Sequence, residues 1–359
     1  MILIIDDDIG VYNVHTKPSE PPKKPKIQAR PVRALLTIVI GLAAIVLFIG
    51  VSIAVGAADI HLQTVIDAIF RFDPDSTQHN IIHELRIPRS LADVLIGAAF
   101  AVSGAVMQGM TRNPLADSGI LGINAGATFM IALSLAFFPG MSYGGTILFS
   151  FIGAALATGL IYGTSYLGKA KITPVRLVLA GVAITSLLTA LSQGIAIHFR
   201  LSQDLAYWVA GGVAGIKMSQ LIGVLPWIAG ALICAMLISR SITLISLGED
   251  IASGLGQKTG LVKLFGGIIV LILAGAAVSV AGPIGFVGLV VPHMVRYIVG
   301  VDYRYIIPCS AVLGGLLMLL ADMGARTINP PYETPISALF ALVGVPFFLY
   351  IARKTGRGL

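Results

Sequence analysis

The sequence predicts an all-α polytopic membrane protein with about ten transmembrane helices. Of its 359 residues, 56% are hydrophobic and only 11% are charged, and the apolar residues occur in long uncharged runs. A bilayer core of roughly 30 Å requires about 20 apolar residues per helix. Runs of that length occur at residues 32–58 and 305–325. The 41 glycines and 18 prolines favour closely packed, locally broken membrane helices over barrel strands, which would alternate polar and apolar residues.

Charged or Pro/Gly-rich breaks between the apolar runs define the predicted spans. They are residues 34–56, 88–108, 118–138, 144–167, 174–198, 219–239, 262–280, 284–299, 305–324 and 335–352. Three regions follow from these boundaries: a polar N-terminal tail over residues 1–33, expected to be disordered, a ten-helix domain over residues 34–354, and a short C-terminal tail over residues 355–359. The start of the chain lacks the short apolar core and small-residue cleavage site of a signal peptide.

The distribution of basic residues predicts the orientation in the membrane. A cytoplasmic N-terminus and an even number of spans place both termini on the cytoplasmic side. Only six of the 24 Lys and Arg residues then face outward, in agreement with the positive-inside bias. These six are Arg71, Arg86, Arg89, Arg200, Lys217 and Arg326.

The sequence argues against several chemistries. Residues 254–260, GLGQKTG, lack two glycines of a phosphate-binding loop, so the chain is not expected to hydrolyse ATP by that route. Ion-coupled transporters usually carry acidic or His residues near the membrane midplane, whereas here Asp93 and Asp322 lie near the outer ends and His293 near the inner half of a short span. We find no catalytic or metal-binding constellation. Cys234 and Cys309 lie in apolar runs, so we expect small core residues rather than a disulfide or a metal pair.

A polar turn over residues 109–127 joins the second and third spans on the predicted inner side. It contains Asn113 and Pro114, and Asp117 or Ser118 could cap the helix that follows. A simple cytoplasmic hairpin is sufficient to explain this segment.

A short amphipathic helix is predicted within residues 246–263, between the sixth and seventh spans. Apolar residues recur there at helical spacing, acidic residues favour a helix start and glycines favour its end; these are Leu247, Ile251, Leu255, Glu249, Asp250, Gly254 and Gly256. Two interpretations remain open from the residues alone. The helix either lies at the membrane surface or docks a soluble partner.

Residues 281–300 form a short predicted span with prolines at its start and in its interior. Gly282 and Pro283 open it, and Pro292 is expected to break it. Such a break is either a structural kink or part of a moving gate.

Five motifs carry a resemblance to a known family. They are R-x-P-R followed by GAA-x-A-x-SG-x-x-MQG (86–109), NPLAD-x-G-x-LG (113–122), LGE-x-x-A-x-x-LG (247–256), GPIGFVGLVVPH (282–293) and GVPFFLYIARK (344–354). With these motifs the chain resembles the FecCD family, the permease subunits of type II ABC importers for iron-siderophores, haem and cobalamin. The resemblance extends from about residue 34 to residue 354.

The resemblance implies a ten-helix permease subunit in a bacterial inner (cytoplasmic) membrane, multi-pass, with both termini cytoplasmic. Its partners would be a second permease subunit, either an identical copy or a sister permease, two ATPase subunits below, and an extracytoplasmic substrate-binding protein above. ATP and Mg2+ would be bound by the ATPase subunits, so this chain itself would bind no cofactor and no nucleic acid. The implied substrate is an iron(III)-siderophore chelate, with haem or cobalamin as the alternative, moved by alternating access.

The resemblance also implies roles for individual residues. Arg86, Arg89 and Arg326 would dock acidic residues of the binding protein, since an exposed guanidinium can hold a carboxylate through two parallel hydrogen bonds. The competing interpretation is intrahelical pairing, of Arg89 with Asp93 and of Arg326 with Asp322. The implied ATPase coupling helix comprises Leu247, Gly248, Glu249, Ala252, Leu255 and Gly256, and the weaker pathway or gate candidates are Gln193, His198, Gly282, Pro283 and Pro292.

Overall fold

The computed structural model describes residues 29–54, 61–167, 174–329 and 332–355. These parts of the chain are helical apart from connecting loops and one isolated bridge between Ala29 and Gly300. The elements are α1 (Pro31–Ala54), α2 (Leu62–Phe70), α3 (Thr77–Ile81), the π-helical turn η1 (Ile82–Arg86), α4 (Ile87–Thr111), the 3-10 turn η2 (Ser118–Leu121), α5 (Ile123–Phe137), α6 (Tyr143–Leu167), α7 (Pro174–His198), α8 (Ser202–Ala210), α9 (Met218–Leu237), α10 (Ser239–Leu247), α11 (Glu249–Gly254), α12 (Thr259–Ala281), α13 (Val287–Val299), α14 (Tyr303–Thr327) and α15 (Ile336–Thr355).

The predicted membrane spans all correspond to observed helices. Within the described residues, seven helices are long and apolar enough to cross a membrane, and three shorter apolar helices, Ile123–Phe137, Val287–Val299 and Ile336–Ile351, occupy the remaining predicted positions. The predicted tail is too long, because α1 already begins at Pro31. The rest of that tail, residues 1–28, and the C-terminal residues 356–359 lie outside the described residues. The short helices α2, α3, α8 and α10 do not correspond to any predicted span.

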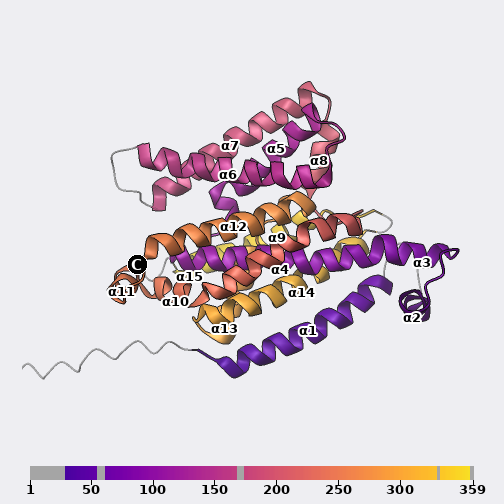
Figure 1. Cartoon of the computed structure of the whole chain (residues 1–359), viewed down its shortest axis with the longest axis horizontal. Helices are drawn as coiled ribbons and strands as arrows, with labels where there is room; N and C mark the ends of the chain where they lie inside the picture. Colours follow the sequence, from indigo (N-terminus) through magenta and orange to yellow (C-terminus); the bar gives the residue numbers. More distant parts are fainter. Residues whose placement is uncertain (1–28, 55–60, 168–173, 330–331, 356–359) are drawn as a thin grey trace, which may run out of the picture.

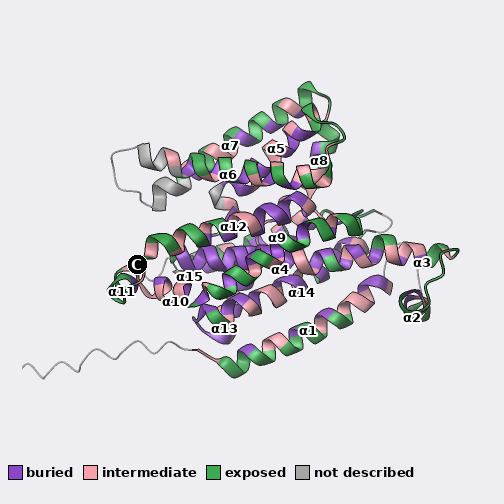
Figure 2. Cartoon of the chain, in the orientation of Figure 1, coloured by how far each residue is buried: buried purple, intermediate pink, exposed green. Residues whose placement is uncertain are grey.

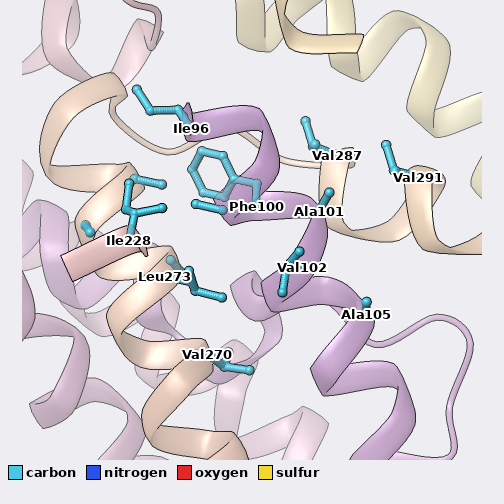
Figure 3. Close-up of a cluster of buried hydrophobic side chains, with 14 of the residues drawn as sticks. Ile96, Phe100, Ala101, Val102, Ala105, Ile228, Val270, Leu273, Val287 and Val291 are labelled. Atoms are coloured by element: carbon cyan, nitrogen blue, oxygen red, sulfur yellow. The ribbon is translucent and has the colours of Figure 1, made fainter. Parts of the chain in front are cut away.

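Helix α4 forms the centre of the bundle. Figure 1 shows it running through the middle of the molecule, with α1, α13 and α14 on one side, α12 on the other, and α5, α6 and α7 gathered beyond α12. In Figure 2 α4 is mostly buried, whereas α1 and α7 carry long exposed faces. Figure 3 shows the packing around Phe100 of α4, where Ile228 of α9, Leu273 of α12 and Val287 of α13 converge.

Small residues on α4 allow its neighbours to approach closely. A methyl group added at Gly97 would overlap the carbonyl oxygen of Gly314 in α14, and one added at Gly104 would overlap the carbonyl oxygen of Gly288 in α13. In a membrane, helix association depends on van der Waals packing because lipid tails are as apolar as the side chains. These glycine contacts therefore hold α13 and α14 directly against the central helix.

Pro292 does not break its helix, so that prediction is wrong. Helix α13 continues through Pro292 from Val287 to Val299. A proline leaves the carbonyl oxygen four residues earlier without its usual N–H donor, and here that oxygen belongs to Gly288. The side-chain Nε2 of Gln108 in α4 donates to it at 2.9 Å. This hydrogen bond from the central helix replaces the missing backbone bond and lets α13 remain regular.

Both described cysteines are free, as expected, but only one is a core residue. Cys309 is fully buried in α14, whereas Cys234 is exposed on the surface of α9. The prediction of two core cysteines is thus wrong for Cys234. An apolar run contains both faces of its helix, and the run alone does not tell which face packs inward.

Gly104→Ala should destabilise the bundle through forced separation of α4 and α13. Overpacking of this kind typically costs about 1–3 kcal/mol, and we expect a thermal midpoint lower by several degrees in detergent or nanodiscs. The matched control is Gly230→Ala in α9, where an added methyl group meets open space. Equal midpoints for the two variants would contradict the packing argument.

The Gln108 interaction should depend on Pro292. Gln108→Leu leaves the buried Gly288 carbonyl oxygen without a partner, which we expect to cost about 1–3 kcal/mol. In a Pro292→Ala background the helix regains its own N–H donor, so Gln108→Leu should cost clearly less. A double-mutant cycle from thermal or denaturant unfolding measures this coupling; additive effects would refute it.

Candidate functional site

The two ends of the bundle carry different chemistry. Figure 1 places α10 and α11 at one end and α2, α3 and α8 at the opposite end. The segment that resembles a coupling helix lies at the first end. Arg86, Arg89 and Arg326 lie at the second, which we call the outer end after the orientation predicted from the sequence.

A single π-helical turn, η1, brings Arg86 inward. It spans Ile82–Arg86 within one continuous helix over Thr77–Thr111. Pro88, at the start of α4, lacks an N–H group and would crowd the carbonyl four residues earlier, and a wider turn relieves both problems. The Arg86 Nη1 donates to the carbonyl oxygens of Ile53 and Ala54, the latter at 3.0 Å. Arg86 therefore caps the C-terminus of α1, where a cation is favoured.

Arg89 uses both edges of its guanidinium group to hold two carboxylates. Nε and Nη2 donate to Asp322 of α14 at distances of 2.8–3.2 Å. Nη1 and Nη2 donate to Glu333, in the loop before α15, at 2.7 and 3.1 Å. Such bidentate pairs are strong and directional. Arg89 therefore connects the central helix to α14 and to the start of α15.

Arg326 completes the same network from α14. Its Nη2 lies 2.9 Å from Asp322, four residues earlier, and donates to Ser52 Oγ of α1 at 2.6 Å. Ser52 in turn shares a hydrogen bond of 2.9 Å with Ser90 of α4. The outer ends of α1, α4 and α14 are thus joined by one set of buried polar contacts.

The expectation that these guanidinium groups are exposed is wrong. Arg86 is buried, and the side chains of Arg89 and Arg326 are only 13% and 7% exposed. The expected intrahelical pair is confirmed for Arg326 with Asp322. It is wrong for Arg89, because Arg89 pairs across helices and neither carboxylate oxygen of the buried Asp93 has a hydrogen-bond partner among the described residues. A role of the arginines in docking stays a prediction.

The segment that resembles a coupling helix forms a short helix, as predicted, with boundaries set by acidic and glycine residues. Helix α11 begins at Glu249 and ends at Gly254. Gly248 and Gly256 flank it with φ angles of 142° and 81°, a region that favours glycine. Leu247 belongs to the preceding helix α10, so the single helix expected to include it is in fact two.

Helix α11 presents an apolar surface while its other face is anchored. Ala252 is buried, but Ile251 and Leu255 are 49% and 67% exposed. The carboxylate of Glu249 accepts hydrogen bonds from Lys263 at 2.6 Å and from Thr259 at 3.3 Å, both in α12. The Lys263 ammonium holds the pKa of Glu249 below its usual value. This anchor is present at neutral pH and is lost as the pH falls through that lowered pKa.

A cavity of about 560 Å³ opens at the outer end beside Arg89. Aromatic residues of α8, the glycine-rich segment 211–215 and the end of α12 form its walls, and they include Tyr207, Trp208 and Gly282. At Gly282, where φ is 68°, an added methyl group would overlap the carbonyl oxygen of Trp208. Only glycine permits this close approach of α12 to α8.

The pathway candidates do not gather at one place. Gly282 lines the cavity and Pro283 lies next to it in the chain, whereas Pro292 is buried within α13. Gln193 and His198 are on exposed positions of α7, outside the lining of this cavity. The structure therefore does not unite these five residues in one site.

Several residues important at these sites were missed from the sequence. Two of them bind arginines that lie far away in the chain: Glu333 binds Arg89 and Ser52 binds Arg326. The third, Lys263, binds Glu249, which lies 14 residues earlier. Phe286 takes a φ of 69°, which is strained for a bulky residue, at the turn before α13. The sequence offered a signal for two of these residues only. Glu333 lies just before the predicted span 335–352, and Phe286 lies among the first residues of the predicted span 284–299.

The sequence is similar to a family of transport proteins and to several of its members. The FecCD transport family matches residues 42–354. The chain is 53% identical over 334 residues to the iron(3+)-hydroxamate import system permease protein FhuB of Bacillus subtilis (strain 168), covering 92% of this chain and 86% of that protein. It is 42% identical to the iron-uptake system permease protein FeuB of the same organism, covering 87% and 94% respectively.

The fold is also similar to that of a solved transporter structure. It is an inward-facing conformation of a transporter described as of the metal-chelate ABC type, with a TM-score of 0.76 and 26% identity, covering 88% of this chain and 98% of that one. The matched residues include Arg86, Arg89 and Arg326, helix α11 and the segment before α13. The chain belongs to the FecCD transport family.

Proposed function

We propose that this chain is the permease subunit of an ABC importer that carries an iron(III)-hydroxamate siderophore chelate. The observation that carries the proposal is the 53% identity, over nearly the whole chain, to a permease named for iron(3+)-hydroxamate import. The separation of a charged outer end from an anchored, apolar coupling helix supports the same function. Haem and cobalamin are the alternative substrates.

The two ends of the bundle suggest how the complex works. An extracytoplasmic binding protein delivers the chelate at the outer end, where Arg89, and with it Arg86 and Arg326, provides the positive charge for acidic docking residues. Two ATPase subunits, which bind ATP and Mg2+, act on α11 from the cytoplasm. A second permease subunit, identical or a sister chain, completes the pathway, and both termini lie on the cytoplasmic side of a bacterial inner membrane.

A secondary transporter working alone is the main rival from another class. Its coupling ion would need acidic groups near the midplane, whereas the described acids of the long spans, Glu84, Asp93 and Asp322, lie near the outer ends. Uptake by the purified chain without ATP would support this rival.

The proposed function can be tested with the chain, its ATPase partner and the candidate binding protein in nanodiscs. We expect ATP hydrolysis to rise when the binding protein carries a ferric hydroxamate, because only the loaded partner should drive the transport cycle. Ferric catecholate, haem and cobalamin serve as competing substrates. Stimulation of ATP hydrolysis by haem or cobalamin alone would overturn the hydroxamate assignment. If no substrate stimulates ATP hydrolysis although the binding protein is active, a heterodimer with a sister permease is favoured.

Removing the apolar surface of α11 should uncouple the ATPase. The double variant Ile251→Ser/Leu255→Ser deletes two exposed anchors, and we expect ATPase binding to weaken by about tenfold, equivalent to about 1.4 kcal/mol. The matched control is Val301→Ser, which alters an apolar residue of 43% exposure between α13 and α14. Titration of the ATPase against reconstituted permease measures the change, and equal affinity of both variants would argue against docking through α11.

A further inference from the structure

The Arg89 guanidinium has no free edge in this chain. The edge formed by Nε and Nη2 faces Asp322, and the edge formed by Nη1 and Nη2 faces Glu333. A guanidinium group offers five N–H donors in a fixed planar fork, so it can hold two carboxylates side by side. Any further carboxylate that binds Arg89 with two hydrogen bonds must replace one of these partners.

The two partners differ in how easily they can be replaced. Asp322 is fully buried and is shared with Arg326 at 2.9 Å. The Glu333 side chain is 45% exposed and, among the interactions described in the structure, is held by Arg89 alone. Water can reach Glu333 but not Asp322, so an exposed pair exchanges readily while a buried one does not.

We propose that Glu333 is an internal substitute for the docking carboxylate of the binding protein, and that docking displaces it from Arg89. This inference rests on the proposed docking role of Arg89 and goes beyond it, because it names the group that occupies the docking position before the partner arrives. We expect the partner to supply an Asp or Glu side chain, since among the ordinary protein side chains a carboxylate matches the two-donor edge that Glu333 leaves. Glu333 is a positioning residue in this scheme, acting through Arg89.

The position of Glu333 connects docking to the cavity. The next residue, Thr334, is fixed by its backbone N–H to the carbonyl oxygen of Ala325 at 3.0 Å. Glu333, Thr334, Pro335 and Ile336 line the cavity of about 560 Å³ together with Arg89. The Arg89–Glu333 pair thus forms part of the rim of this cavity, directly before α15 begins at Ile336. Displacement of Glu333 changes that rim when the partner binds, while Thr334 keeps the backbone in place.

The test is the affinity of the binding protein for the permease complex in nanodiscs. Glu333→Gln removes the competing charge but retains the shape of the side chain, and we expect binding to tighten by roughly two- to fivefold, the range for an exposed ion pair. The matched control is Glu84→Gln, which removes one negative charge from an exposed position of η1 at the same end. The control corrects for the general gain in attraction towards an acidic partner.

The same measurement in an Arg89→Lys variant distinguishes the displacement of Glu333 from the proposed docking role of Arg89. Arg89→Lys keeps the charge but loses the fork, so docking should weaken and the gain from Glu333→Gln should disappear. Unchanged affinity in Arg89→Lys would refute the docking role of Arg89 itself. If Arg89→Lys weakens docking but Glu333→Gln equals Glu84→Gln or weakens binding, the docking role stands and the displacement of Glu333 is overturned.

Discussion

Asp322 is the buried anion on which the outer end of the bundle depends. It is fully buried between two arginines from different helices, and a carboxylate in that position is tolerable only because both guanidinium groups neutralise it and donate hydrogen bonds. Loss of either arginine would leave a buried charge with half of its partners. The network therefore fixes the positions of α1, α4 and α14 relative to one another, and the arginines that the resemblance assigns to docking are first of all structural.

The glycine contacts extend this constraint along the bundle. Gly97 and Gly104 bring the central helix against α14 and α13, so that a displacement at one end of α4 is shared by its neighbours. At the other end of α14, Asp302 accepts a hydrogen bond from Thr243 of α10 at 3.3 Å, and Gln257, just after α11, donates to Ser241 of α10 at 3.1 Å. A continuous set of packed and hydrogen-bonded elements thus joins the outer-end network to α11.

Much of the fold could be predicted because apolar runs of membrane-spanning length are an unambiguous signal. That signal predicts the seven long helices, and charged or Pro/Gly-rich breaks delimit the three shorter ones. Acidic residues and glycines predict the start and end of α11, but not its separation from α10. The sequence alone could not show that Arg86 turns inward through a π-helical turn, that Glu333 pairs with Arg89 across 244 residues, or that Gln108 compensates for Pro292. Each of these depends on a contact between distant segments, and local patterns carry no information about such partners.

The two carboxylates that bind Arg89 differ in exposure. We infer that the buried one stabilises the helix junction and that the exposed one can be exchanged for a carboxylate of a partner. Asp322 is completely buried and links α14 to α4, whereas Glu333 is nearly half exposed and connects only the loop before α15 to α4. Exchange at Glu333 leaves the Arg89–Asp322–Arg326 contacts intact, because they use the other edge of the Arg89 guanidinium. A single arginine can therefore contribute to a rigid helix junction and still offer a replaceable bond at the surface.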